Sequence, residues 1–344
     1  MKSKKADTLY CGVRKAKIEE AVPTLNEESL NLFMGYIKER YKIHIRKDVQ
    51  LKKPPYTKNK ILKKYIFTNV RREHDKETKW LLQNITENEF LTYRQKILNS
   101  ILFRMFNKHE TMEIMDGPFK FGSLWSYTAA RNKLLSYSKE HPDYVFFTGA
   151  FITAGLKNAA KSRYPKEDFM PGCILRYISD INRSELVPDL LACKNQKQVF
   201  NRLRAEEGIG DFLAYQIFVD LTYIKEFPFS ENEFTIAGPG CKNGLNFLFE
   251  DRDGMSYEEC LFWLRDNWYG FSDSKVFFDP EKEMIDLKHY DRKMNVMSLE
   301  NCFCEFSKYY RAVKHIGRPN RTYVSRLKTA SQVEEKEIEQ EERE

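Results

Sequence analysis

The chain has 344 residues, of which 42% are hydrophobic, 31% charged and 14% aromatic, so it can bury a core and global disorder is excluded. No apolar run reaches the roughly 20 residues of a membrane span, and the basic start MKSKKADTLY lacks the apolar stretch of a secretory signal. We expect an intracellular protein that does not enter a membrane, nuclear if eukaryotic and cytoplasmic if from a phage or a bacterium.

The seven cysteines and six histidines are scattered along the chain. Cys302 and Cys304 form a C-x-C pair, but no second pair lies at zinc-finger spacing, and neither H-x-x-x-H nor H-E-x-x-H occurs. Dispersed cysteines favour reduced thiols in an intracellular compartment. The sequence therefore predicts no cofactor and no metal site.

The net charge of +7 is unevenly distributed. Residues 333–344 hold seven acids and two bases, so the rest of the chain carries +12. Between Lys38 and Lys79, fifteen Lys and Arg residues stand against five Asp and Glu, with aromatic residues interleaved. This pattern favours a polyanionic partner, most simply double-stranded DNA, although a solvated lysine-rich face is the alternative. Residues 326–344 are expected to form a disordered acidic tail.

We expect residues 1–20 to form a flexible lead-in. A helix then follows Pro23, with Thr24 or Asn26 as its N-cap, acids in its first turn and an apolar face that extends to Tyr41. KKPPYTKN at 52–59 predicts a proline break and a turn.

Helical patterns continue to the end of the ordered chain. Helices are expected in part of 61–82 and over 89–106, 124–138, several segments of 173–223, 256–268 and 299–313. Loops are expected over 115–123 and 226–244, and the apolar run YVFFTGAFI at 144–152 fits a short strand or the start of a buried helix. With few or no strands, the fold class is mostly α, in one helical domain over 21–325.

The segment NRLRAEEGIGDFLAYQIFVDLTY predicts a helix-hairpin-helix element within 197–223. Gly208 and Gly210 would let the backbone approach a DNA phosphate, whereas an ordinary turn with Gly208 as the helix cap is the alternative. Glu231 and Glu233 follow at the distance where helix-hairpin-helix glycosylases carry a catalytic carboxylate, although no V-D-T-H-type segment is present and solvated loop acids would look the same.

Directly afterwards, GPGCKNGLN offers a phosphate-binding nest of backbone amides ahead of a helix. Its predicted contacts are Gly238, Gly240 and Lys242. The pattern G-x-x-x-x-G-K-[ST] is absent, so a P-loop nucleotide kinase is not expected from this chain.

Two further segments combine charge with aromatic residues. FTNVRREHDKET places Asn69, Arg72, Glu73 and Asp75 within two turns of an expected helix, where they could hold a base edge or an amine, or simply form surface ion pairs. LENCFCEFSKYYRAVKHIGRPNRTY predicts a terminal helix followed by an irregular arginine-rich segment. Its buried stripe is Cys302, Phe306 and Tyr309, its spaced charges are Glu300, Glu305, Lys308 and Arg311, and its candidate phosphate clamp is Arg318 with Arg321.

Five of these segments, in this order, resemble a known family: FTNVRREHDKET, VFFTGAFI, GIGDFLAYQIFVDLTY, GPGCKNGLN, and ENCFCEFSKYYR with GRPNRTY. The family is that of the DNA base hypermodification proteins of the α-glutamyl/putrescinyl-thymine pyrophosphorylase group, related to the helical domain of 5-hydroxymethyl-deoxyuridine DNA kinases. The resemblance covers about 22–323, nearly the whole ordered chain. It implies a helix-hairpin-helix DNA-glycosylase-like helical fold and a role in bacteriophage pathways that decorate thymine-derived bases.

The resemblance also implies the chemistry: an activated phosphate or pyrophosphate ester of 5-hydroxymethyluracil is displaced by an amine from an amino acid or a polyamine. Lys242, Arg72 and the loop at 238–240 would stabilise the leaving group. Glu233, Glu73 or Asp75 would deprotonate the incoming amine, and the base would be extruded from the duplex.

Three functions remain open from the sequence. The first is this DNA-modifying transferase, and an enzyme is the favoured interpretation of the sequence. The second is a non-catalytic helical module that binds DNA for a P-loop 5-hydroxymethyluracil DNA kinase. The third is a DNA glycosylase that acts through Glu231 or Glu233.

Overall fold

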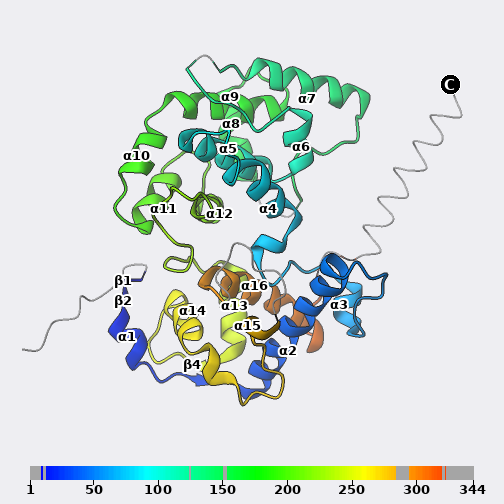
Figure 1. Ribbon diagram of the computed structural model, residues 1–344, viewed down its shortest axis with the longest axis vertical. Helices are drawn as coiled ribbons and strands as arrows, with labels where there is room; N and C mark the ends of the chain where they lie inside the picture. The colour runs from blue at the N-terminus through cyan, green and yellow to red at the C-terminus, as the bar shows by residue number, and fades with distance from the viewer. Residues whose placement is uncertain are drawn as a thin grey trace, which may run out of the picture. The chain divides into compact units, whose positions relative to one another are not determined.

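The computed structural model describes residues 9–10, 13–123, 125–149, 153–283, 294–319 and 322. Helices dominate this part of the chain, and its strands are short: β1 (Leu9–Tyr10) pairs with β2 (Val13–Arg14), and β3 (Thr24–Leu25) pairs with β4 (Phe249–Asp251) (Figure 1). The prediction of a mostly α fold is confirmed. Within the described ranges, no helix has the length and apolar sequence that crossing a membrane requires.

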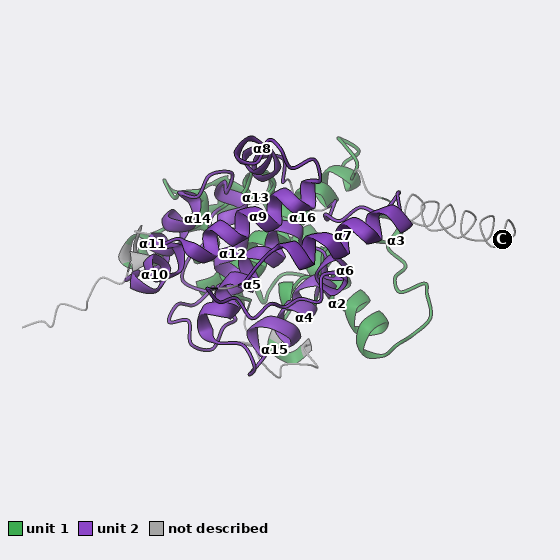
Figure 2. Cartoon of the chain, turned by 90° about the horizontal axis from the view of Figure 1, so that it is seen from above, with its two compact units in different colours: residues 1–7, 14–74, 237–344 green, residues 8–13, 75–236 purple. Residues whose placement is uncertain are grey.

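The chain forms two compact units, coloured separately in Figure 2. Unit 1 contains residues 1–7, 14–74 and 237–344, and unit 2 contains 8–13 and 75–236. The larger part of unit 2 is thus a continuous insertion between two segments of unit 1. Compactness alone does not show that either unit folds independently, so the single domain over 21–325 stays a prediction.

Unit 1 is built around two helices of its segment 237–344, which are α13 and α16. Its elements are α1 (Lys15–Glu20), β3, α2 (Glu27–His44), the π-helical turn Ile45–Val49, α3 (Lys60–Lys64), the 3-10 turn Arg72–His74, α13 (Pro239–Leu248), β4, α14 (Tyr257–Asp266), the 3-10 turn Trp268–Phe271, α15 (Pro280–Glu283) and α16 (Val296–Val313). Phe33 of α2 stacks on Phe303 of α16, with their ring centroids 4.2 Å apart, so the N-terminal and C-terminal segments share one core.

Several local predictions in unit 1 are confirmed. The Asn26 side chain caps α2 by accepting from Ser29 N, and the stripe Cys302, Phe306 and Tyr309 is buried in α16. The loose lead-in does not extend over 15–20, because these residues form α1 with Ile18 buried. The tail at 326–344 lies outside the described residues.

Glycines let α13 and α16 approach each other closely. A Cβ atom at Gly244 would overlap the backbone oxygen of Phe303, and one at Gly240 would lie 2.6 Å from Cys304 Sγ. The glycines of GPGCKNGLN therefore have a packing role in addition to any role in ligand binding.

Replacing Gly244 by alanine is expected to lower the free energy of unfolding by about 2 kcal/mol, because overpacking a core costs about 1–3 kcal/mol and alanine recovers part of it through helix propensity. Gly35→Ala is the matched control, since its Cβ would meet Val276 at an ordinary 3.6 Å. Urea denaturation of both variants tests this. Equal stability of the two would contradict the close packing of α13 on α16.

Unit 2 consists of helices around α5. Its elements are α4 (Lys76–Leu81), the π-helical turn Leu82–Thr86, α5 (Tyr93–Phe106), α6 (His109–Ile114), α7 (Thr128–Glu140), α8 (Ala154–Arg163), α9 (Met170–Arg183), α10 (Leu186–Ala192), α11 (Gln196–Arg204) and α12 (Asp211–Thr222). Arg104 of α5 forms a buried ion pair with Asp220 of α12, with Nη2 2.8 Å from Oδ1. Because both partners lie inside the core, removing either would leave a buried charge.

Two predictions about elements of unit 2 are corrected. The helix expected from residue 89 begins at Tyr93, because Thr92 and Gln95 form a capping box that sets its start. Residues 144–149 are neither strand nor helix, and 150–152 lie outside the described residues. Thr111 Oγ1 donates to Phe146 O and Thr148 N donates to Phe106 O, so the surrounding helices satisfy this irregular backbone.

Candidate functional site

The segment 67–71 lies against α16 in unit 1 and is not helical. Its backbone carbonyls accept hydrogen bonds from side chains: Arg40 donates to Phe67 O at 3.2 Å, and Asn301 donates to Asn69 O at 3.1 Å. The expected helix therefore does not include Asn69, because within 67–74 only Arg72–His74 form a helical turn. Side-chain donors from α2 and α16 satisfy the backbone carbonyls of this segment, which in a helix would be bonded to backbone N–H groups.

Glu73 is buried beside an arginine. Its Oε1 atom lies 2.5 Å from Arg71 Nε, and both side chains are 1% exposed. Charge removal at one partner would leave the other charge buried, so this pair has an evident structural role. The catalytic role of Glu73 stays a prediction.

Glu300 of α16 is the most strongly perturbed carboxyl group near this segment. It accepts a hydrogen bond from Gly238 N at 3.2 Å, at the start of α13. Burial raises the pKa of Glu300 to about 7, and the bond from Gly238 and the charge of Arg72 only partly oppose that rise. Ala237 N is held in the same way by Glu258 at 2.9 Å. A carboxylate thus already occupies the amide of Gly238, which was a candidate for binding a phosphate, and a second carboxylate occupies the preceding amide of Ala237.

The raised pKa of Glu300 makes stability depend on pH. Below a pH of about 4.5 its carboxyl is protonated in both folded and unfolded chains, and between there and about 7 only the folded chain keeps the proton. Stability should therefore fall by about 3 kcal/mol as the pH rises through this window, and then level off. Glu300→Gln should abolish the fall, as urea denaturation from pH 5 to 8 would reveal, whereas the exposed Glu281→Gln should retain it. A wild-type profile with no fall would contradict the buried state of Glu300.

Unit 1 contains a cavity of about 570 Å³ between the end of α2 and α3, here called the α2–α3 cavity. Its lining residues are Arg40, Ile43, His44, Lys47, Asp48, Pro54, Pro55, Tyr56, Thr57, Leu62, Lys63 and Asn69. The volume falls within the usual range of small-molecule sites, about 300–1,000 Å³. Three cationic side chains and a ring of apolar and aromatic groups therefore surround a space of nucleotide size.

Asp48 is the one carboxylate among these lining residues. Its Oδ2 atom lies 2.8 Å from Nδ1 of His44, one helical turn earlier. His44 is 3% exposed and stacks on His74, with ring centroids 4.0 Å apart, so the imidazole holds Asp48 in a fixed orientation. The cavity thus presents an oriented carboxylate, together with the Asn69 amide, among cations.

A second cavity of about 560 Å³ lies on the other side of α3 in unit 1. Its lining residues are Lys60, Ile61, Lys64, Tyr65, Ala312, His315, Gly317 and Arg318. Lys63 lines the α2–α3 cavity, whereas Lys60 and Lys64 line the second cavity. The short helix α3 therefore carries three lysines that border the two cavities. We call Lys60, Lys63, Lys64 and Arg318 the α3 basic surface.

The predicted hairpin lies in unit 2, between α11 and α12. Gly208 has a φ of +80°, and a Cβ atom there would lie 2.7 Å from Ala159 Cβ of α8. Gly210 has no atom within 4 Å of such a Cβ and begins α12 as its N-cap. Gly208 is therefore a packing glycine in a left-handed turn, while Gly210 lies in open space. Phosphate binding by the hairpin stays a prediction.

The remaining predicted site residues are distributed over both units. Gly240 and Lys242 lie inside α13, not in a loop, so the glycine-rich loop expected up to 244 ends at Gly238. Exposed Glu233 accepts from Gln196 Nε2 at 2.6 Å in unit 2, and Asp75 begins α4 there. In unit 1, Lys308 pairs with Glu305 at 2.5 Å, Arg311 is exposed, and Arg321 lies outside the described residues.

Little in the sequence pointed to the groups that the structure adds. Asp48 stands in a lysine-rich stretch, and Glu300 looked like one of several spaced helix charges. The six described cysteines are free, and burial raises the pKa of Cys304 to about 12 and that of Cys302 further. Neither thiol of the C-x-C pair is thus a ready thiolate nucleophile.

Comparisons with known proteins bear on this geometry. A family model described as "5-hmdU DNA kinase, helical domain" matches residues 27–318. The 5-hmdU DNA kinase of Bacillus phage SP10 is 25% identical over 302 residues, which are 84% of this chain and 46% of that protein. The chain thus spans about half the length of this curated relative. No solved structure matches the chain significantly.

Proposed function

Because the chain belongs to the family of the 5-hmdU DNA kinase helical domain, we propose that it acts on 5-hydroxymethyluracil in double-stranded DNA. The proposed reaction replaces an activated ester of the hydroxymethyl group by an amine. The α2–α3 cavity carries this proposal, because it combines nucleotide-sized space, three cations and one oriented carboxylate.

DNA binding is assigned to the α3 basic surface. The second cavity is lined by Lys60, Lys64 and Arg318, and a phosphate backbone can lie there along α3. Lys63 belongs to the α2–α3 cavity, so a nucleotide extruded beside α3 would keep its phosphate near a cation as its base enters. Asn69 also lines this cavity, and its Nδ2 atom donates to His74 O at 3.0 Å, which orients the amide beside the space that the base would enter.

The chemical step is a substitution at the exocyclic carbon of the base. The C–O bond to the phosphate or pyrophosphate breaks, the leaving group keeps the electron pair, and a C–N bond forms to the amine. Arg40, Lys47 and Lys63 neutralise the departing anion. Asp48 attracts the ammonium group of the amino acid or polyamine and accepts the proton that it must lose before attack.

Asp48 takes precedence over the carboxylates predicted earlier for a geometric reason. It lines the cavity and is 29% exposed, whereas Glu73 is buried against Arg71. Glu233 and Asp75 belong to unit 2. They remain candidates for the same role, and the variants described in the Discussion separate them.

A second function is supported by the length of the relative. Since the matched region is 46% of a protein named as a DNA kinase, this chain could be a non-catalytic module that presents DNA to a P-loop kinase. A glycosylase that uses Glu231 or Glu233 is the third candidate, and it has less support because Glu233 is exposed and bonded to Gln196.

The deciding experiment supplies the full chain with duplex DNA that contains phosphorylated or pyrophosphorylated 5-hydroxymethyluracil, together with amino acids and polyamines. Mass spectrometry of the digested nucleosides is the readout. A thymine-plus-amine mass supports the transferase and identifies the donor. An unchanged nucleoside profile with salt-sensitive DNA binding supports the accessory module, and abasic sites support the glycosylase.

A further inference from the structure

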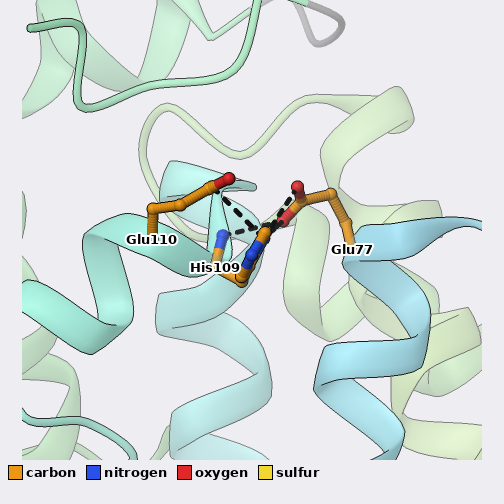
Figure 3. Close-up of side chains that lie close together, drawn as sticks. All are labelled: Glu77, His109 and Glu110. Atoms are coloured by element: carbon orange, nitrogen blue, oxygen red, sulfur yellow. Dashed lines mark hydrogen bonds and ion pairs between the residues drawn. The ribbon is translucent and has the colours of Figure 1, made fainter.

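Unit 2 contains a cluster of potential metal ligands that the proposed function does not use. Glu77 on α4 and His109 and Glu110 at the start of α6 point toward one another (Figure 3). The His109 Nδ1 atom lies 3.1 Å from Glu77 Oε1 and 3.2 Å from Glu110 Oε2. One nitrogen and two carboxylate oxygens thus lie within 4.8 Å of one another.

The second oxygen of each carboxylate is held by another donor. Glu77 Oε2 accepts from the backbone N of His109 at 2.7 Å, and Glu110 Oε1 accepts from Lys76 Nζ at 2.8 Å. These bonds orient the two carboxylates so that Glu77 Oε1 and Glu110 Oε2 both face the imidazole. Such outer hydrogen bonds are a usual feature of metal sites, where they fix the ligands before the ion binds.

The two distances from the imidazole to the carboxylates match those around a small divalent ion. Ligands at about 2.0–2.2 Å from a metal lie about 3.0–3.4 Å apart in octahedral or tetrahedral geometry. The two distances from His109 Nδ1 fall in this range. From this geometry, we propose that Glu77, His109 and Glu110 bind a divalent transition-metal ion.

The ligand set narrows the choice of ion. An imidazole nitrogen with two carboxylates suits Mn²⁺, Fe²⁺ or Zn²⁺ better than Mg²⁺, which prefers oxygen donors. The His109 side chain is 10% exposed, whereas those of Glu77 and Glu110 are 27% and 39% exposed. The two carboxylates are therefore within reach of solvent, from which water or a phosphate oxygen can complete the shell.

The competing account is an ion-pair cluster in which a protonated His109 bridges two glutamates and Glu77 caps α6. It predicts no saturable metal binding. Lys76 lowers the affinity for a cation, but its bond to Glu110 leaves the second oxygen of that carboxylate directed at His109. The two accounts differ at Glu77, because glutamine there can still accept from the His109 backbone N–H but loses the charge that a metal needs.

The test uses the full chain, stripped with a chelator and titrated with MnCl₂ by electron paramagnetic resonance and with ZnSO₄ by calorimetry. We expect one saturable site whose affinity falls at least tenfold in both Glu77→Gln and His109→Gln. Glu113→Gln, an exposed change on the same helix, should bind as the wild type does.

Two results would overturn the proposal. One is the absence of saturable binding at neutral pH. The other is binding that survives in both Glu77→Gln and His109→Gln, which would place the ion on other groups such as the seven acids of 333–344. Circular dichroism of each variant confirms that it is folded, so a loss of binding can be assigned to the ligands.

Discussion

Asp48→Asn is expected to lower the rate of amine transfer about 10²- to 10⁴-fold, the usual contribution of a positioned general base. Asparagine has the same shape and can still accept a hydrogen bond from His44, so the α2–α3 cavity should keep its form. What is lost is the negative charge that attracts the ammonium group and takes its proton. Nucleoside mass spectrometry at a series of donor concentrations would measure both the maximal rate and the apparent donor affinity.

The matched control for this variant is Asp273→Asn, which makes the same chemical change at an exposed position in the same unit. It should leave the transfer rate unchanged, and both variants should bind duplex DNA as the wild type does. Full activity of Asp48→Asn would remove Asp48 as the base. In that case, Glu73→Gln, Glu233→Gln and Asp75→Asn would decide among the three carboxylates predicted from the sequence.

The triple variant Lys60→Gln, Lys63→Gln, Lys64→Gln is expected to weaken DNA binding about 100-fold near physiological salt. Each lysine that neutralises a phosphate releases a counterion, so the slope of log affinity against log salt should fall by about 0.9 for each lysine removed. Fluorescence anisotropy with a labelled duplex at several salt concentrations gives both quantities. The short α3 is held by its Asn59 cap and buried Leu62, which the substitutions leave intact.

Three exposed lysines outside α3 provide the control for charge. Lys197→Gln, Lys275→Gln and Lys282→Gln remove the same number of positive charges from exposed positions. If this variant lost as much affinity as the α3 variant, binding would depend on net charge and the α3 basic surface would have no special role. Binding that is insensitive to salt in the wild type would contradict the nucleic-acid partner itself.

The two variants together separate the proposed functions. A transferase loses turnover but not binding in Asp48→Asn, and loses both in the α3 variant. An accessory module shows no turnover of its own, and its binding responds only to the α3 variant. The DNA-binding measurements on the two variants therefore still test the α3 basic surface if the isolated chain has no transfer activity.

Local signals in the sequence determined the helical class and many of the boundaries. Asn26, Ser256 and the prolines at 54 and 55 act on their immediate neighbours, so the start of α2, the start of α14 and the break before α3 could be read directly. The basic stretch was equally visible because its lysines are contiguous. Charge that is dense along the chain becomes dense on a surface wherever the chain is exposed.

Tertiary structure decided which polar groups meet. The non-helical form of 67–71 depends on donors from α2 and α16, and the raised pKa of Glu300 depends on burial beside α13. Glu77 and His109 are 32 residues apart and share a cluster only because α4 packs beside α6. Helical periodicity specifies which face of a helix is buried, but not which other helix covers it. The sequence alone thus determined the helical class of this protein, many of its helix boundaries and its basic stretch. The packing of helices that are distant in the sequence decided the burial of Glu300 and the candidate metal site.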